Sequence, residues 1–199
     1  GTTLGIVGDP NPDWRGGFGT TLSYKKLSLN VLFETFQGGD FYEGTRGVLV
    51  NFGTYADVGN EVTLSKDMYN YAGTLFKAGT TLRGNVKDYG GGPVLLDQSF
   101  YTSIGGHSGQ LTEQFVRDGS WTRIREITLG YQLNSAGFRK KTKLESVSFA
   151  VTARNPVLWT KVVGIDPETN VSGVGNARGV DYFNNPSTKS LVLSLKINY

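Results

Sequence analysis

Cysteine is absent from the 199-residue chain, and histidine and methionine each occur once. Without cysteine there is no disulfide framework, no thiolate metal ligand and no cysteine nucleophile, and one histidine is too few for a multi-histidine metal site. Only six prolines accompany the 28 glycines, which is too little proline for a disordered low-complexity chain. We therefore expect a folded protein without a thiolate or multi-histidine metal site, and we assign it no metal ion and no cofactor.

Long apolar runs and a strong charge of one sign are also missing. No stretch reaches the roughly 18 consecutive apolar residues of a transmembrane helix, although the alternating strands of a transmembrane β-barrel would escape the same search. The net charge is +3, and the basic residues are spread out apart from a cluster at Arg139, Lys140, Lys141 and Lys143. This distribution argues against nucleic acid as a partner.

The first residue is Gly1, and neither an initiator methionine nor the basic and apolar regions of a signal peptide follow. We expect any targeting signal to lie upstream or to have been removed.

Glycine and aromatic residues are abundant. The chain has 3 Trp, 10 Tyr and 11 Phe, and with many Thr, Val and Leu residues this composition favours β-structure over helices. Segments that alternate between apolar and polar residues predict strands with one apolar and one polar face. These segments are residues 17–24, 27–36, 121–133, 146–155 and 190–199. Unbroken alternation in segment 121–133 would place Arg123 and Arg125 on its apolar face.

The connections between these segments alternate between short and long. Lys25 and Lys26 form a tight hairpin connection and residues 134–143 a short one, whereas residues 37–115 and 156–189 are long. Such long irregular connections are unusual in compact soluble domains, but outer-membrane barrels combine short periplasmic turns with long extracellular loops. The pattern predicts an all-β fold, an antiparallel transmembrane β-barrel segment with long extracellular loops. Because about eight strands are the lower limit for a closed barrel, further strands must come from elsewhere.

This topology gives several side chains a predicted environment. Tyr24, Tyr131 and Tyr199 fall at the periplasmic ends of their strands, on the apolar face, where amphipathic rings favour the membrane interface. The residues that we expect to face lipid on the last strand are Leu191, Leu193, Leu195 and Ile197. Within the first long connection, residues 47–52 (GVLVNF) and the aromatic-rich residues 69–76 (YNYAGTLF) could extend the sheet.

Three motifs carry information beyond the alternation. They are GDPNPDWRGGF at residues 8–18, VRDGSWTRIREITLGY at 116–131 and ARNPVLWTKVVGIDPETN at 153–170. In this order, followed by a terminal strand with an aromatic end, they resemble the C-terminal end of the SusC/RagA family of TonB-dependent outer-membrane transporters. The third motif departs from the family at ARNPVL, so we expect a different transition from strand to loop there.

The resemblance implies that residues 1–199 are the C-terminal part of a bacterial outer-membrane barrel of about 22 strands, whose plug and earlier strands lie outside this chain. It also implies import of glycan or peptide fragments, without enzymatic activity. The implied partners are the rest of the barrel and its plug, a SusD-like surface lipoprotein, the TonB complex and outer-membrane lipid.

Some residues in the motifs have two interpretations. Asp9, Asn11 and Asp13 could offer oxygen ligands to Ca²⁺, but a rigid turn fixed by the intervening prolines is the favoured interpretation, and the same holds for residues 166–168. Arg123, Arg125 and Glu126 could contact substrate, but structural ion pairs are favoured. Trp159 is a further candidate for substrate contact at the rim of the barrel.

Two other functions remain open. A secreted β-sandwich that binds carbohydrate would use Trp14, Trp121 and Trp159 as stacking platforms. A hydrolase would need a nucleophile such as Ser108 beside His107, but GHSGQ at residues 106–110 lacks the G-x-S-x-G pattern of a nucleophile elbow.

Overall fold

The computed structural model describes residues 5–106, 111–173 and 178–199. Internal contacts divide the chain into two compact units. The sheet unit comprises Pro10–Asp40, Asp118–Thr169 and Asn185–Tyr199, and the loop unit comprises the other described residues. Among the described residues, no helix has the length and apolar character needed to cross a membrane.

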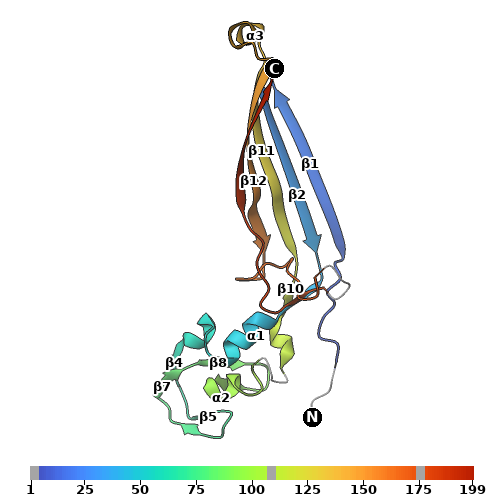
Figure 1. Ribbon diagram of the computed structural model, residues 1–199. Helices are drawn as coiled ribbons and strands as arrows, with labels where there is room; N and C mark the ends of the chain where they lie inside the picture. Colours follow the sequence, from blue (N-terminus) through green and yellow to red (C-terminus); the bar gives the residue numbers. More distant parts are fainter. Residues whose placement is uncertain (1–4, 107–110, 174–177) are drawn as a thin grey trace. The chain divides into compact units, whose positions relative to one another are not determined.

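The sheet unit contains one five-stranded antiparallel sheet whose order, β1-β2-β11-β12-β14, follows the sequence (Figure 1). Its strands are β1 (Trp14–Tyr24), β2 (Leu27–Gln37), β11 (Trp121–Leu133), β12 (Ser146–Thr160) and β14 (Ser190–Asn198). All five predicted strands are therefore confirmed. The largest differences are at β1, which begins three residues earlier than predicted, and at β12, which continues five residues beyond Asn155.

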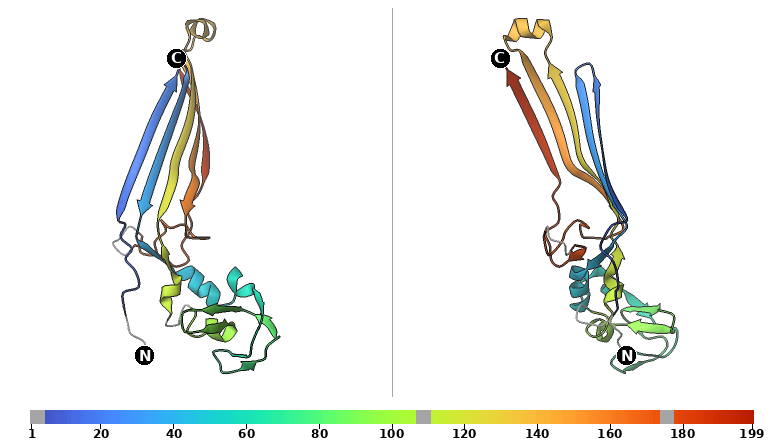
Figure 2. Two further views of the ribbon diagram at one scale, coloured as in Figure 1. Left: turned by 180° about the vertical axis from the view of Figure 1, so that it is seen from behind. Right: turned by 90° about the vertical axis from the view of Figure 1, so that its right-hand side faces the viewer.

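The two short connections lie at the same end of the sheet as the C-terminus (Figure 2). Lys25 adopts a φ of +54° in the hairpin between β1 and β2. The connection between β11 and β12 contains helix α3 (Ala136–Thr142), which Ser135 caps by accepting a hydrogen bond from the backbone N–H of Phe138. Arg139, Lys140 and Lys141 of the basic cluster lie in the last turn of α3, where positive charge is stabilised by the helix dipole, and Lys143 follows as the C-cap.

The register of the sheet collects apolar residues on one face. Residues directly opposite each other on neighbouring strands share a face. One complete row across the five strands is Leu22, Leu29, Leu129, Val151 and Leu193. The next row toward the short connections is Tyr24, Leu27, Tyr131, Phe149 and Leu195. On β14 the side chains of this face, Leu191, Leu193, Leu195 and Ile197, are 50 to 75% exposed, so no described residue covers this face there.

The opposite face of the sheet is polar. One row consists of Thr21, Asn30, Thr128, Thr152 and Val192. Thr21 donates a hydrogen bond of 2.6 Å to Asn30, and the hydroxyl groups of Thr128 and Thr152 lie 2.8 Å apart. The sheet is thus two-sided over its whole width, as the alternation predicted.

A β-bulge at Arg125 breaks the alternation of β11. Ile124 lies opposite Phe33 and Glu126 opposite Leu32, so Arg125 is an extra residue without a partner in this register. The bulge returns Ile124 to the apolar face and turns Arg123 to the polar face, opposite Glu34. The prediction that Arg123 and Arg125 lie on the apolar face is therefore wrong, because it assumed a continuous strand.

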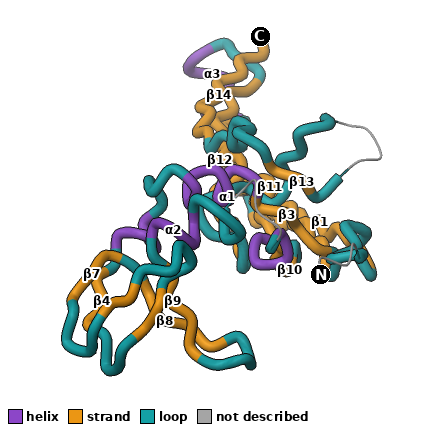
Figure 3. The backbone as a smooth tube through the Cα atoms, turned by 90° about the horizontal axis from the view of Figure 1, so that it is seen from below, coloured by secondary structure: helices purple, strands orange, loops and turns teal. Residues whose placement is uncertain are grey.

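The loop unit is built from short elements and has its own core. Its strands are β3 (Asp40–Glu43), β4 (Glu61–Thr63), β5 (Met68–Tyr69), β6 (Leu75–Phe76), β7 (Thr81–Arg83), β8 (Asn85–Asp88), β9 (Pro93–Leu96), β10 (Val116–Asp118) and β13 (Val180–Asp181), with the ends of β3 and β10 reaching into the sheet unit. Its helices are α1 (Gly44–Asn51), α2 (Gln98–Tyr101) and the 3₁₀ turns η1 (Ala56–Gly59) and η2 (Thr112–Phe115). Figure 3 shows β4 beside β7 and β8 beside β9, the pairs that the register also gives.

Two buried clusters stabilise the loop unit. Val50, Val58 and Phe115 form one, and Leu64, Met68 and Leu95 form the other. Residues 47–52 were predicted to extend the sheet, and this prediction is wrong, because most of the segment forms α1. The carboxylate of Asp181 accepts a hydrogen bond of 3.1 Å from the N–H of Thr45 in the first turn of α1. Residues 69–76 belong to the small hairpin of β5 and β6, which lies outside the five-stranded sheet.

Candidate functional site

A cluster of charged side chains lies at the start of β11, beside the loop that follows β12, on the polar face of the sheet unit. Arg123 and Arg125 are at its centre: the bulge described above turns Arg123 to this face, and Arg125 pairs there with Glu34. Their acidic partners are Glu34 on β2 and the two acidic residues of the loop after β12, Asp166 and Glu168. The structure thus unites the charged residues of the second and third sequence motifs.

Arg123 is the most deeply buried member, with 1% of its surface exposed. Its Nη2 donates a hydrogen bond of 2.5 Å to Asp166, and its Nη1 donates one of 2.8 Å to the hydroxyl group of Ser187. Ser187 in turn donates to Asp166. Nε of Arg123 lies 3.2 Å from Glu168 but is not oriented for a hydrogen bond.

Arg125 is less buried and bridges two carboxylates. It donates a hydrogen bond of 2.6 Å from Nε to Glu34, and both of its Nη atoms donate to Glu168 as a fork. Glu34 also accepts a hydrogen bond of 2.9 Å from Nε of Arg15 on β1. The guanidinium carbons of Arg123 and Arg125 lie 5.7 and 5.2 Å from the ring centroid of Trp121, which stacks on Phe36.

Hydrogen bonds lower the pKa values of two carboxyl groups near the cluster, those of Asp166 and Asp118. Burial acts to raise the pKa of Asp166, but hydrogen bonds from Arg123 and Ser187 outweigh it and hold the pKa below the usual 3.8. Nearby, Lys161 donates a hydrogen bond of 2.8 Å to Asp118, and this bond, with those from Ser120, lowers the pKa of Asp118 to about 2. The pair of Lys161 and Asp118 is largely exposed and therefore adds little stability.

The arginines of the cluster are already paired with acidic residues of the same chain. Arg15, Arg123 and Arg125 all have carboxylate partners within the chain, and Arg123 is out of reach of a ligand. Glu126, the third member of the sequence-based cluster, pairs instead with Arg154 at 3.4 Å. The contacts favour the structural interpretation of these arginines, in which they fix residues 166–168 to β11.

Trp159 is not part of this cluster. It lies opposite Thr122, on the face away from Arg123, and is 52% exposed. Tyr24 and Tyr131 share a row with Phe149, which sequence reasoning missed as a third ring at this level, and Tyr199 follows the end of β14.

The acidic turns form no cluster suited to a cation. Among the described residues, no group of three or more acidic or histidine side chains is placed to hold a metal ion. Gly38 and Gly39 pack against the turn of residues 10–13, where an added Cβ at Gly38 would lie 2.8 Å from the backbone nitrogen of Asp13. Both glycines have φ near +80°, so this close packing requires glycine. His107 and Ser108 lie outside the described residues.

The sequence held one signal for the charged cluster that pattern reasoning did not use. The second motif presents two arginines two residues apart, and the third presents two carboxylates two residues apart. This complementarity of sign and spacing matches the observed pairs, Arg123 with Asp166 and Arg125 with Glu168.

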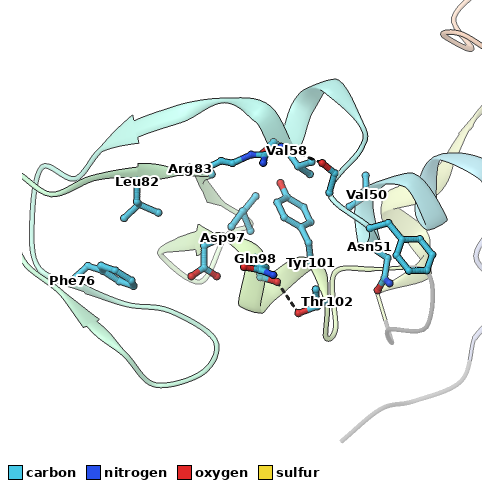
Figure 4. A pocket seen from close by; sticks show the side chains of 14 residues that line it. Val50, Asn51, Val58, Phe76, Leu82, Arg83, Asp97, Gln98, Tyr101 and Thr102 are labelled. Atoms are coloured by element: carbon cyan, nitrogen blue, oxygen red, sulfur yellow. Dashed lines mark hydrogen bonds between the residues drawn. The ribbon is translucent and has the colours of Figure 1, made fainter.

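The loop unit contains a second candidate site, a cavity of about 370 Å³ (Figure 4). Its walls come from α1, η1, the β6–β7 region and α2. The apolar lining residues are Val50, Phe52, Val58, Phe76, Leu82 and Leu96. Arg83, Asp97, Gln98 and Tyr101 supply polar groups. A neighbouring cavity of about 600 Å³ shares Val50, Val58, Leu96 and Tyr101 with it and carries charged residues of both signs.

Comparison with known proteins shows which proteins the chain is similar to. No model of a protein family matches the chain. TonB-dependent receptor P3 of Formosa agariphila is 27% identical over 98% of this chain, and TonB-dependent receptor P26 of the same organism is 26% identical over 98%. The chain spans only 17 and 18% of the length of these two relatives.

Solved structures give the same result for the fold. The RagAB peptide importer in its closed-closed state matches with a TM-score of 0.61 at 20% identity, over 98% of this chain and 18% of that chain. Another structure of the RagAB peptide transporter matches with a TM-score of 0.60 at 19% identity, over 95% of this chain and 17% of that chain.

These relatives are receptors and importers of the bacterial outer membrane rather than enzymes, and the predicted location in that membrane is confirmed. The resemblance carried by the three motifs is confirmed as well: over nearly its whole length, the chain is similar to one segment of the TonB-dependent receptors, and its fold is similar to that of the RagAB importers.

Proposed function

We propose that this chain supplies wall strands and extracellular loops to a TonB-dependent importer of glycan or peptide fragments. The rest of the barrel and its plug, the TonB complex and a SusD-like surface lipoprotein are its partners. Residues 1–199 form the C-terminal part of the barrel, and β14 is its assembly strand. No catalytic step is assigned to any residue.

The observation that carries this proposal is the apolar face that runs across all five strands. In water, leaving a Leu side chain exposed forgoes about 1.5–3 kcal/mol relative to burying it. The face has many such side chains, and lipid would remove this penalty. The polar face, with its hydrogen-bonded Thr, Asn and Glu side chains, suits a water-filled lumen.

The edges of the sheet support the same proposal. Within the described residues, β1 and β14 each have a partner on one side only. An unpaired strand edge in hydrocarbon costs several kcal/mol for each unsatisfied backbone group. Pairing both edges with further strands of a closed barrel satisfies these groups.

The alternative of a secreted β-sandwich receives less support. A sandwich needs a second sheet of similar size to cover the apolar face of the first. The other sheets among the described residues have two or three short strands, formed mostly within the loop unit.

Import is tested in the bacterium that encodes the chain. Disruption of the gene should abolish uptake of fluorescent glycan or peptide fragments, and reintroduction of the intact gene should restore it. Uptake should also stop when an uncoupler removes the proton gradient. Unchanged uptake without the gene, or recovery of the protein from the medium instead of the outer membrane, would contradict the proposal.

A further inference from the structure

The cavity of about 370 Å³ in the loop unit has the size of a binding site for a small group. It lies near the lower end of the range of about 300–1,000 Å³ that is usual for ligand pockets. All of its lining residues belong to the loop unit, so its shape is defined within that unit. In Figure 4, Phe76 and Leu82 lie on one side, Tyr101 stands near the middle, and Arg83 extends along the upper edge.

Arg83 is held in one orientation without a neutralising partner. Its Nε donates a hydrogen bond of 2.8 Å to the carbonyl of Val58, and its Nη2 donates one of 3.1 Å to the carbonyl of Gly53. In the described part of the chain, no carboxylate lies within ion-pair distance of Arg83, and no group accepts a hydrogen bond from Nη1. The guanidinium group is therefore pre-oriented and has donors free for an anion.

The acidic residue of the cavity does not offset this charge by pairing. Asp97 already accepts hydrogen bonds from Asn70, from the hydroxyl group of Ser99 and from the backbone N–H of Phe100. Its carboxylate caps α2 and links it to Asn70. An anionic group that enters the cavity therefore finds its donors at Arg83.

The apolar walls indicate which class of molecule carries the anionic group. A sugar ring presents a hydroxyl group on most of its carbons, and each one placed against an aliphatic wall without a partner costs free energy. The aliphatic and aromatic walls suit an apolar side chain instead. An apolar side chain next to a carboxylate is the chemistry of the last residue of a peptide.

We propose that this cavity binds the C-terminal residue of a short peptide, with the carboxylate at Arg83 and the apolar side chain against Phe76 and Leu82. The inference rests on the proposed import function, and it selects peptide over glycan as the substrate class. It gives Arg83 the role of recognising a free C-terminus.

The test uses the purified full-length transporter that contains this chain, in detergent. The probe is Gly-Gly-Leu labelled with fluorescein at its N-terminus, supplied as the free acid and as the C-terminal amide, and binding is followed by fluorescence polarisation. The acid should bind at least about tenfold more tightly than the amide, because only the acid forms a charge-assisted pair with a guanidinium group. Comparison of the two probes on the unaltered protein requires no variant to fold.

Variants then assign the effect to Arg83. Arg83→Gln should bring acid and amide to equal affinity, and Arg83→Lys should restore part of the preference because it keeps the charge but loses the fork. Lys66→Gln is the matched control, since Lys66 is an exposed cation of the loop unit that lines neither cavity, and it should keep the full preference.

Three results would overturn the inference: equal affinity of acid and amide on the unaltered protein, a preference that survives in Arg83→Gln, or Arg83-dependent binding of labelled trigalacturonate that exceeds binding of the peptide. Failure of the import proposal is seen separately, as the absence of proton-gradient-dependent uptake of any peptide or glycan. Uptake that persists while acid and amide bind equally leaves the import proposal standing and removes only the peptide site.

Discussion

Individual residues of the charged cluster show how a buried ion pair fixes a loop. Arg123 could not be buried to this extent without Asp166 and Ser187, because an unpaired charge in a dry environment is strongly destabilising. The pair thus couples the start of β11 to the loop after β12, although 43 residues separate them in sequence. Arg125 adds a forked contact from the bulge to Glu168 in the same loop.

Removal of one member of the pair should be much worse than removal of both. Arg123→Leu leaves Asp166 buried without its partner and should lower stability by about 3–5 kcal/mol. The double variant Arg123→Leu with Asp166→Leu should recover most of that loss. Heat-dependent mobility of the full-length protein on SDS gels measures the unfolding temperature, and Lys161→Met, which removes an exposed ion pair, is the control with a small effect. Equal losses in the single and double variants would refute the role given to the pair.

The lowered pKa of Asp166 gives the stability a defined pH dependence. A carboxyl group with a lower pKa in the folded state stabilises the fold above its unfolded pKa, and this contribution is lost as the pH falls through the folded pKa. The difference in unfolding temperature between the unaltered protein and Asp166→Asn should therefore be full near neutral pH and shrink below about pH 3.8. A difference that stays constant down to pH 2 would show that the carboxylate charge of Asp166 does not contribute.

At the scale of elements, the sequence predicted every long strand but not the interruptions within them. Period-two alternation is a direct consequence of the strand backbone, so the five strands of the sheet were recognisable. The bulge was not recognisable, because the residues before and after one inserted residue each alternate normally. If Arg125 is left out, Trp121, Arg123, Glu126 and Thr128 follow one face without a break, which is the arrangement observed.

The loop unit was harder to predict because its elements are short. A run such as GVLVNF has no period long enough to distinguish helix from strand. The contacts that favour a helix at α1 come from other parts of the chain. The carboxylate of Asp181 accepts a hydrogen bond from the N–H of Thr45, and Val50 packs with Val58 and Phe115. The same holds for the charged cluster, in which Arg123 and Arg125 of the second motif pair with Asp166 and Glu168 of the third.

The two faces of β14 should respond differently to charge. Leu193 belongs to the apolar row that crosses all five strands, whereas Ser194 belongs to the polar row with Ala150 and Gly130. Leu193→Arg should destabilise the inserted protein by about 2–4 kcal/mol if the residue lies near the middle of the bilayer, and Ser194→Arg should be much milder. Folding of the full-length protein into lipid vesicles over a urea series measures both. Equal effects would contradict the assignment of the apolar face to lipid.

At the scale of the whole molecule, chain connectivity separates two ends of the sheet. The hairpin at Lys25 and Lys26, the connection that contains α3, and the C-terminus share one end. Both long connections leave from the other end, and between them they contain most of the loop unit. In outer-membrane barrels short turns face the periplasm and long loops face the exterior, which gives the chain a direction across the membrane.

This direction can be tested with epitope tags in the full-length protein. Gly91 suits an insertion in the first long connection, because it lies in an exposed turn between β8 and β9 with open space around it. Gly164 suits an insertion in the second long connection, because it is exposed and also has open space around it. Thr142, the last residue of α3, marks the opposite end of the sheet.

Antibody should label the tags at Gly91 and Gly164 on intact cells, because long connections of a barrel project into the medium. A tag at Thr142 should be labelled only after the outer membrane is made permeable. Immunoblots of the outer-membrane fraction establish that all three tagged proteins are present in equal amounts. Labelling of Thr142 on intact cells, with Gly91 and Gly164 silent, would reverse the direction of the chain and place the cavity with Arg83 on the periplasmic side, where it could not meet a substrate that arrives from outside.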